Sequence, residues 1–252
     1  MLRIIIQGIN GRMGKTLCHL ISERDDCAVV CGIDQNCEGE NIPVFPTLSM
    51  ANIKADVLID FSVPSATISS LAICTERLLP CVICTTGFTS EQQNIINTAS
   101  KTIPVFQSAN MSLGVNLLIE LVKKANAILG FDYDIEIIEK HHNNKIDAPS
   151  GTALMLANAI NEDNSNEYNY VYDRHAVRAK RDKREIGIHS VRGGNIVGEH
   201  DVIFAGQNEV ITLSHSAASR DVFASGAVSA AIFLAKQAPG IYNMEAMINK
   251  TT

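Results

Sequence analysis

Residues 139–152, E-K-H-H-N-N-K-I-D-A-P-S-G-T, form the segment whose side chains could both hold an anion and move a proton. The unperturbed pKa of histidine is about 6.5, so His141 or His142 could hold or release a proton at working pH. Lys145 adds a positive charge to the same segment. A proton donor beside a bound anion is what the reduction of an anionic, unsaturated acid requires.

The end of this segment predicts the start of a helix, at P-S-G-T in residues 149–152. The N–H groups of a first helical turn have no acceptor within the helix, and the helix dipole favours negative charge there. We therefore expect the backbone N–H groups of Gly151 and Thr152, together with the Thr152 hydroxyl, to bind an anionic group.

Two other interpretations of the paired histidines stay open. They could hold a metal ion with His189, His200 or His215, although these residues lack the compact spacing of common metal sites. A purely structural role is the second alternative. The C-V-I-C run at residues 81–84 lies in a predicted strand, where residues three apart point to opposite faces, so we expect no metal site there either.

A second stretch, G-I-N-G-R-M-G at residues 8–14, follows the first apolar run and opens a helical pattern. In that context glycines let the backbone approach the pyrophosphate of a dinucleotide, which binds at the helix N-terminus. The spacing is G-x-x-G-x-x-G rather than G-x-G-x-x-G, so the position in the chain supports the interpretation more than the spacing does. Asp34 follows Gly14 by 20 residues and could accept hydrogen bonds from ribose hydroxyls.

Two further loops follow apolar runs, T-T-G at residues 85–87 and S-A-N-M at residues 108–111. The carboxyl ends of parallel strands meet at one edge of a sheet, where ligands bind. Both loops could therefore contact the nicotinamide half of a dinucleotide. Ordinary loop chemistry is an equally good explanation from spacing alone.

The elements that must position these residues fall into two patterns. Short apolar runs alternate with helical stretches up to about residue 111, which is typical of a parallel sheet covered on both faces. Apolar and polar residues then alternate at 132–139, which suits a strand with one solvated face. The runs are 2–6, 28–33, 56–61, 81–84 and 103–106; the helical stretches are 11–23, 64–77 and 90–101, the last opening with S-x-x-Q at Ser90.

The predicted fold is α/β, with a Rossmann-type doubly wound parallel sheet and a second, smaller α+β domain built on an open mixed sheet. We expect residues 1–111 and 221–252 to form the dinucleotide-binding domain, because the closing helix near 221–236 should return to the first sheet. Residues 112–220 would form the substrate-binding and oligomerisation domain. Residues 161–185 are polar and irregular, as expected of a long loop.

Composition excludes several classes of protein. The 252 residues carry a formal net charge of −6, so bulk nucleic-acid binding is not expected, and acids dilute the basic stretch at 174–184. No apolar run approaches the roughly 20 residues of a membrane span, and the N-terminus lacks a signal cleavage site. The seven cysteines are odd in number and crowded into one third of the chain, which favours reduced thiols and a cytoplasmic location.

Over essentially its whole length the sequence resembles the 4-hydroxy-tetrahydrodipicolinate reductase (dihydrodipicolinate reductase) family of lysine biosynthesis. The run E-I-I-E-K-H-H-N-N-K-I-D-A-P-S-G-T-A at residues 136–153 is the longest and most specific part of the resemblance. The other matching motifs are G-R-M-G at 11–14, D-F-S-V-P at 60–64, T-T-G-F at 85–88, A-N-M-S-L-G-V-N at 109–116, G-E-H at 198–200 and S-R at 219–220.

The resemblance implies a role for each matching position. His141 matches the proton donor and acceptor of the family, and Lys145 matches its second proton donor. The positions that match contacts to the substrate carboxylates are His142, Gly151, Thr152 and Arg220. Those that match dinucleotide contacts are Gly8, Ile9, Asn10, Gly11, Arg12, Met13, Asp34, Cys84, Thr85, Thr86, Ser108, Ala109, Asn110 and Met111.

The implied reaction is hydride transfer from NADH or NADPH to a cyclic dicarboxylate, with protonation and loss of water, in a homotetramer. Asp34 would repel a 2′-phosphate, and Gln35 stands where some members carry an arginine, so we expect NADH to be preferred. Arg12 could offset that repulsion and admit NADPH. Cys84 replaces a glycine that is frequent in the family, which makes close backbone approach to the cofactor less certain there.

Two other functions remain as alternatives. One is another Rossmann-type dehydrogenase acting on an amino acid such as aspartate, and the other is a non-catalytic regulator that senses NAD. A regulator would need the glycine turn but gives no reason for His141, Lys145 and the anion site to coexist. The spacing from Lys145 to Thr152 favours the reductase over the dehydrogenase.

Overall fold

The computed structural model describes residues 1–37, 39, 41–163, 165–175 and 177–250, which form two compact units. The first unit contains Met1–Leu113 and Asp221–Thr252, and the second contains Gly114–Arg220. Residues 251 and 252, the end of the first predicted domain, lie outside the described residues. No helix in the described ranges is long and apolar enough to cross a membrane.

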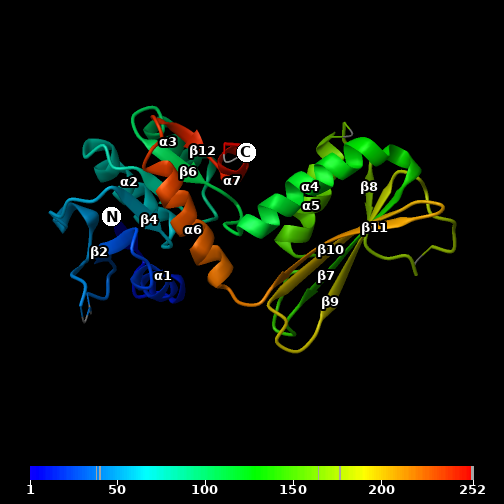
Figure 1. Ribbon diagram of the computed structural model, residues 1–252, viewed down its shortest axis with the longest axis horizontal. Coiled ribbons are helices and arrows are strands. Elements are labelled where there is room, and N and C mark those ends of the chain that lie inside the picture. Colours follow the sequence, from blue (N-terminus) through cyan, green and yellow to red (C-terminus); the bar gives the residue numbers. More distant parts are fainter. Residues whose placement is uncertain (38, 40, 164, 176, 251–252) are drawn as a thin grey trace. The chain divides into compact units, whose positions relative to one another are not determined.

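A seven-stranded sheet forms the centre of the first unit, and all its neighbouring strands are parallel (Figure 1). The strand order is β12-β6-β5-β4-β1-β2-β3. The chain therefore starts inside the sheet at β1, adds β2 and β3 on one side, and then adds β4, β5, β6 and β12 on the other. The predicted Rossmann-type sheet is therefore confirmed. Its strands are β1 (Leu2–Gln7), β2 (Cys27–Ile33), β3 (Val44–Phe45), β4 (Val57–Asp60), β5 (Cys81–Ile83), β6 (Pro104–Gln107) and β12 (Gly240–Tyr242).

Helices cover both faces of this sheet, as its apolar strands require. The sequence does not predict β3 and β12, because strands of two and three residues are too short to show a period. One face packs against α1 (Arg12–Ser22), α6 (Asp221–Leu234) and α7 (Met244–Asn249), and the other against α2 (Pro64–Glu76), α3 (Ser90–Ala99) and the 3₁₀ helix η1 (Leu48–Met50).

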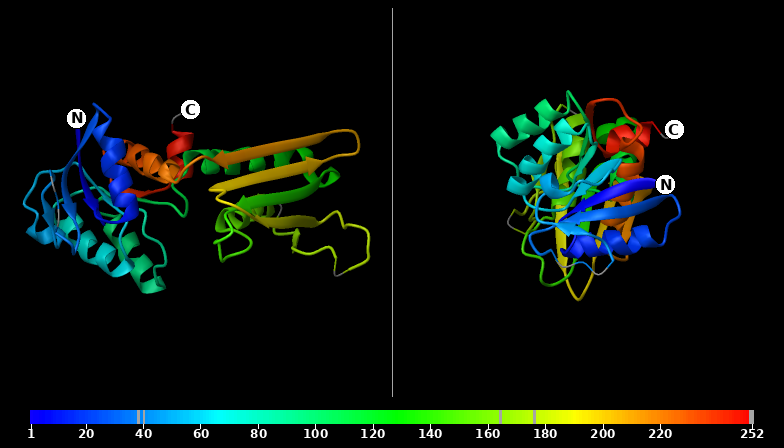
Figure 2. Two further views of the ribbon diagram at one scale, coloured as in Figure 1. Left: turned by 90° about the horizontal axis from the view of Figure 1, so that it is seen from below. Right: turned by 90° about the vertical axis from the view of Figure 1, so that its left-hand side faces the viewer.

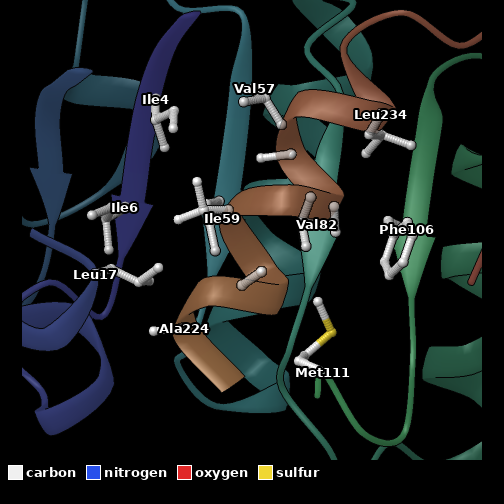
Figure 3. Close-up of a cluster of buried hydrophobic side chains, with 14 of the residues drawn as sticks. Ile4, Ile6, Leu17, Val57, Ile59, Val82, Phe106, Met111, Ala224 and Leu234 are labelled. Atoms are coloured by element: carbon white, nitrogen blue, oxygen red, sulfur yellow. The ribbon is translucent and has the colours of Figure 1, made fainter. Parts of the chain in front are cut away.

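The central strand β1 shows how both faces become core. Ile4 and Ile6 join the cluster under α6, whereas Ile5 joins the cluster on the opposite face. Figure 3 shows the first of these clusters, with α6 lying across the strands. The small side chains of α6 allow a close approach, and at Gly226 an added Cβ would overlap the carbonyl oxygen of Met111.

The start of α3 differs by one residue from the predicted capping motif. Thr89 rather than Ser90 is the N-cap, and its hydroxyl accepts from the backbone N–H of Gln92 at 3.3 Å. The Gln92 side chain in turn accepts from the Thr89 N–H at 2.9 Å. Thr89 and Gln92 have the same spacing as Ser90 and Gln93, so the sequence pattern could not distinguish the two registers.

The second unit contains a mixed five-stranded sheet of order β11-β10-β7-β9-β8 (Figure 2). The β7–β9 and β8–β9 pairs are parallel, and the β7–β10 and β10–β11 pairs are antiparallel. Helices α4 and α5 bury one face, and the predicted smaller mixed sheet is confirmed. The elements are α4 (Leu113–Leu129), η2 (Gly130–Asp132), β7 (Asp134–His141), α5 (Gly151–Asp163), β8 (Asn169–Val171), β9 (Glu185–Arg192), β10 (Gly198–Ala205) and β11 (Val210–Ala217).

The prediction of one long irregular loop over residues 161–185 was wrong in part. Helix α5 continues to Asp163, and β8 pairs with β9 inside this stretch; residues 164 and 176 lie outside the described residues. The Asn161 side chain bonds both the N–H and the carbonyl of Tyr168, at 2.9 and 3.1 Å. A side-chain amide therefore orders this polar stretch, a contact that no periodic pattern reveals.

Strand β7 carries polar side chains into the buried face of its sheet. Ile135 and Ile137 are fully buried against the helices. Glu139 and His141 follow on the same face, because side chains of a strand alternate, and both are buried. The end of β7 is therefore where the core of the second unit changes from apolar to ionisable.

Candidate active site

The glycine turn after β1 has the backbone that a dinucleotide-binding turn needs. Gly8 has a φ of +78°, and a Cβ there would lie 2.6 Å from the carbonyl oxygen of Phe61. A Cβ at Gly14 would overlap the carbonyl oxygens of Gly8 and Ile9. Gly11 is the N-cap of α1 and has extended backbone. Only glycine fits at Gly8 and Gly14, because a Cβ at either position would overlap a carbonyl oxygen. The turn therefore packs closely against the start of α1.

Asp34 joins this turn to the loop after β2. Its Oδ2 accepts from the backbone N–H of Asn10 at 3.0 Å, and its Oδ1 accepts from that of Asn36 at 3.1 Å. Gly8 and Asp34 line a cavity of about 470 Å³ together with hydroxyl side chains that include Ser62. No lysine or arginine is among the described residues that line it.

A buried carboxylate ties the ends of β4 and β5 together behind the same turn. Asp60 is fully buried and accepts from the N–H and the hydroxyl of Ser62, at 2.9 and 2.5 Å, and from the Thr67 hydroxyl. Burial raises its pKa. The Ser62 N–H also lies 3.2 Å from the Thr85 hydroxyl, and the Gln7 side chain donates to the Ser62 hydroxyl at 3.0 Å.

The other predicted cofactor contacts lie at the ends of β5 and β6, as expected. Burial raises the pKa of the Cys84 thiol well above its usual value, with Asp60 adding to the effect. The Ser108 hydroxyl donates to the Asn110 carbonyl at 2.9 Å, which closes the turn after β6. The Met111 side chain is buried in the core beneath α6.

Glu139 is the centre of the site in the second unit. Its carboxylate is fully buried and accepts from the Arg192 guanidinium at 2.7 and 2.8 Å and from the Ser150 N–H at 3.1 Å. The His141 Nδ1 lies 2.6 Å from the same carboxylate. Although burial opposes it, the hydrogen bonds from Arg192 and other donors lower the pKa of Glu139 to about 2. The carboxylate is therefore ionised at neutral pH.

Lys145 and Arg220, two cationic residues predicted to act in the site, have separate partners. Lys145 donates to both carboxylate oxygens of Asp147, at 2.8 and 2.9 Å. Arg220 lies 3.5 Å from the Nε2 of His142, and both line a cavity of about 330 Å³ with Asn144, Asn195 and Val197. His142 and Arg220 are thus brought together across 78 residues of sequence.

Helix α5 begins where the sequence predicted, with Gly151 and Thr152 in its first turn. Ser150, the residue before the helix, accepts through its hydroxyl from the Ala153 N–H at 3.1 Å. The same hydroxyl lies 3.1 Å from the Nε2 of His200, whose pKa burial lowers to about 4. His200 is therefore neutral at pH 7, and among the described residues no group of three or more His, Cys, Asp or Glu could hold a metal ion.

The family of this chain follows from comparison with known proteins. The family profile described as "Dihydrodipicolinate reductase, N-terminus" matches residues 2–111, and "Dihydrodipicolinate reductase, C-terminus" matches residues 114–248. The chain belongs to the dihydrodipicolinate reductase family. It is 52% identical over 250 residues to the 4-hydroxy-tetrahydrodipicolinate reductase of Caldanaerobacter subterraneus subsp. tengcongensis, covering 99% of both chains. The enzyme of the same name from Clostridium tetani is 47% identical over 99% of this chain and 98% of its own.

Solved structures agree with this family assignment. Dihydrodipicolinate reductase from Paenisporosarcina sp. TG-14, solved with dipicolinate bound, superposes with a TM-score of 0.82 at 28% identity and covers 96% of this chain and 97% of its own. A diaminopimelate dehydrogenase of C. glutamicum shares the fold alone, with a TM-score of 0.56 at 13% identity over 96% and 92% of the two chains. The predicted family and the predicted oxidoreductase class are confirmed.

Sequence reasoning missed several residues that hold this dihydrodipicolinate reductase site in place. Glu139 and Asp60 lie within recognised motifs, but their burial and their partners are not visible in the sequence. Asp147 lies in the same run as Glu139 but was assigned no role, and Arg192 carried no signal of one. A buried acid at i and a histidine at i+2 on one strand is a pattern that could have drawn attention to Glu139 and His141.

Proposed function

We propose that this chain reduces 4-hydroxy-tetrahydrodipicolinate to tetrahydrodipicolinate, with loss of water, in the diaminopimelate route to lysine. The observation that carries the proposal is the ionised Glu139 holding His141 beside the start of α5, within the segment most specific to the family. A bound NADH or NADPH would supply the hydride. The protein must then bind two carboxylates and provide one proton for each turnover.

His141 is the proposed proton donor and acceptor. It is 9% exposed, so its ring is held in place while one edge can still meet a ligand. Its Nδ1 is engaged by Glu139 at 2.6 Å, which leaves Nε2 as the atom that exchanges a proton with the substrate.

Lys145 is the proposed second proton donor. Its ammonium is paired with Asp147 at 2.8 and 2.9 Å, and this pair holds it in the loop between β7 and α5. The same pairing lowers the pKa of the Asp147 carboxyl, which keeps that carboxyl negative beside the ammonium. An anionic substrate would compete with Asp147 for Lys145 and so bring the ammonium to the reacting ring.

The substrate carboxylates are proposed to bind His142, Gly151, Thr152 and Arg220. The first turn of α5 offers backbone N–H groups and the positive end of the helix dipole. Arg220 can bind a carboxylate with two parallel hydrogen bonds, and His142 lies 3.5 Å from its guanidinium. These groups fit a dicarboxylate better than a neutral substrate.

The dinucleotide is proposed to bind along the carboxyl edge of the sheet in the first unit. The turn at residues 8–13 and the start of α1 suit the pyrophosphate, because Gly8 and Gly14 keep Cβ atoms out of the approach. Asp34 and the cavity beside it suit the adenosine ribose. Cys84, Thr85 and Thr86, with Ser108, Ala109, Asn110 and Met111, would meet the nicotinamide half.

We further propose that NADH is preferred over NADPH. The negative Asp34 lines the cavity and no cation among its described lining residues could meet a 2′-phosphate. Arg12, the first residue of α1, is exposed and is the one cation within the turn at residues 8–14. Gln35→Arg should increase kcat/KM for NADPH while Gln35→Ala does not, and a clearly higher kcat/KM of the unmodified protein with NADPH would contradict the preference.

The reaction itself is tested by NADH oxidation on freshly made substrate. Dihydrodipicolinate synthase with pyruvate and aspartate semialdehyde generates 4-hydroxy-tetrahydrodipicolinate in the assay. Loss of absorbance at the nicotinamide band should follow addition of the protein and require both substrates of the synthase. Absence of turnover with both cofactors in correctly folded protein would refute the proposed function.

The homotetramer and the cytoplasmic location remain predictions. We propose that the second unit forms the contacts between four copies of the chain, on the basis of the family resemblance. Sedimentation should then give a mass near four times 27.3 kDa, about 109 kDa. A monomer at micromolar concentration would contradict this assembly.

A further inference from the structure

Glu139 is held by more donors than a structural ion pair between two strands needs. Arg192 of β9 gives it two hydrogen bonds, at 2.7 and 2.8 Å, and the Ser150 N–H gives a third at 3.1 Å. Another contact is the Nδ1 of His141 at 2.6 Å. A carboxylate that is fully buried can stay ionised only with such a complete set of donors.

An ionised carboxylate only accepts hydrogen bonds, so the His141 Nδ1 in contact with it must carry a proton. In the neutral ring this places the lone pair on Nε2, and in the charged ring it leaves the Nε2 proton as the one that can be given away. The choice between the two neutral forms of the ring is thus made by Glu139 rather than by His141 itself.

The space beside Nε2 is kept open by a glycine. A Cβ at Gly198 of β10 would lie 3.1 Å from the His141 Nε2, closer than ordinary packing. No positive φ is recorded for Gly198, so its backbone does not by itself demand glycine. Glycine at this position instead leaves room for the His141 ring, because a side chain there would crowd Nε2.

We propose that Glu139 is the positioning residue of His141: held ionised by Arg192, it fixes the proton on Nδ1 and directs Nε2 toward the substrate over Gly198. This inference rests on the proposed function of His141 as proton donor. Arg192 acts indirectly, because removing it would leave a buried carboxylate without its counterion, and that carboxylate would become protonated.

Arg192 also reaches the second proton donor. Its guanidinium donates to the Asp147 carbonyl at 2.7 Å, and the Asp147 side chain holds Lys145. One half-buried cation therefore supports Glu139 on β7 and the loop that carries Lys145. Substitution of Arg192 should affect both proton donors, whereas substitution of Glu139 should affect His141 alone.

His200 is the other ring near His141, and it does not replace Glu139 as a partner. The two rings meet edge to face with centroids 5.3 Å apart, and the His200 Nε2 contacts the Ser150 hydroxyl instead. Among the described residues, the charged and titratable groups in contact with the His141 ring include Glu139, which Arg192 holds, and the neutral His200 on β10.

The first experiment uses the unmodified protein labelled with ¹⁵N in its histidine rings. At a pH where the ring is neutral, long-range ¹H–¹⁵N spectra should show His141 with its proton on Nδ1, the less common form of free histidine. The signals are assigned by their loss in His141→Gln. A proton found on Nε2 would overturn the proposal without any need for a variant of Glu139.

The second experiment compares Glu139→Gln with Glu136→Gln, a glutamate of the same strand that also contacts a histidine and arginines but on the other face. Loss of a group that orients another costs about 10- to 100-fold. Glu139→Gln should lower kcat by that factor, leave the KM for NADH within about twofold, and remove the Nδ1–H signature. Glu136→Gln should leave kcat and the His141 signals unchanged.

Two further variants separate this inference from the proposed function. His141→Gln combined with Glu139→Gln should be no slower than His141→Gln alone, because groups that act as a unit are not additive. Gly198→Ala keeps Glu139 and Arg192 intact and should lower kcat by crowding Nε2. Slow His141→Gln with normal Glu139→Gln would reject the positioning role alone, whereas normal His141→Gln would reject the proposed function.

Discussion

Two glutamates of β7 hold a histidine and arginine side chains in similar ways on opposite faces of the strand. Glu139 contacts His141 at 2.6 Å and Arg192 at 2.7 Å. Glu136 contacts His189 at 2.8 Å, Arg174 at 2.6 Å and Arg181 at 3.1 Å. The residue types are the same, but the Glu139 side chain is fully buried while that of Glu136 is 22% exposed.

This difference in burial decides what each cluster can do. Water can replace a lost partner of Glu136, so its contacts hold the chain around Arg174 and Arg181 without depending on any single partner. Water does not reach Glu139, so every one of its lone pairs depends on a protein donor. The same residue types therefore stabilise the chain in the more exposed Glu136 cluster, whereas in the buried Glu139 cluster they hold a side chain in a fixed orientation.

The largest expected difference between the clusters is in turnover. His141→Gln should lower kcat by roughly 10²–10⁴, the usual effect of losing a proton-transfer group, and Lys145→Ala should lower it by a similar factor. His189→Gln, which removes the histidine of the exposed cluster, should leave kcat within about twofold. Steady-state kinetics with saturating NADH measures all three. Near-normal kcat in His141→Gln and Lys145→Ala would remove both residues from catalysis.

The next difference is in stability. Arg192→Met leaves Glu139 buried without its counterion and should lower the free energy of unfolding by about 3 kcal/mol. Arg174→Met removes a partner whose side chain is 36% exposed and should cost about 0–1 kcal/mol. Urea unfolding at neutral pH compares the two variants. Equal losses would show that burial does not separate the clusters.

The last expected effect, which is confined to acidic conditions, is a dependence of stability on pH. Burial lowers the pKa of His200, the cross-strand neighbour of Glu139, from its ordinary 6.5 to about 4. The unfolded chain therefore binds the proton more readily. The stabilisation is complete above pH 6.5 and is lost as the pH falls toward 4, by up to about 3 kcal/mol.

The variant His200→Gln tests the direction of this dependence of stability on pH. The variant should lose less stability than the unmodified protein between pH 6.5 and pH 4, while Glu139, whose pKa is about 2, contributes its own loss mainly at lower pH. Unfolding curves at a series of pH values measure the slope. The same slope in both proteins would mean that His200 is not held neutral by its environment.

The sequence predicted those elements whose formation depends on a few neighbouring residues. The strand at residues 2–6, the glycine turn and the helix after it were predicted because a buried strand, a tight turn and a helix start each leave a mark within a few residues. The same holds for the start of α5 at Gly151. The capping residue of α3 and the short strands β3 and β12 were not predicted, because their signals are ambiguous or too short.

The sequence indicated the reactive residues of the proposed site but not the residues that hold them in position. The segment from His141 to Thr152 stood out because its residue types are unusual together. Glu139 and Arg192 are ordinary charged residues 53 apart in the chain, and nothing in either position marks a bond between them. They meet only because β7 and β9 pair in parallel with Lys140 beside Val191 and His141 beside Arg192.

The sequence by itself determined the family and the two types of sheet, and it predicted the residues that we propose bind a dinucleotide and move a proton, because these depend on residue types at fixed spacing. Tertiary structure decided which of those groups are ionised and which atom of His141 is left for chemistry. Both depend on burial and on donors from distant strands, since the cost of a charge is set by whether water or protein surrounds it.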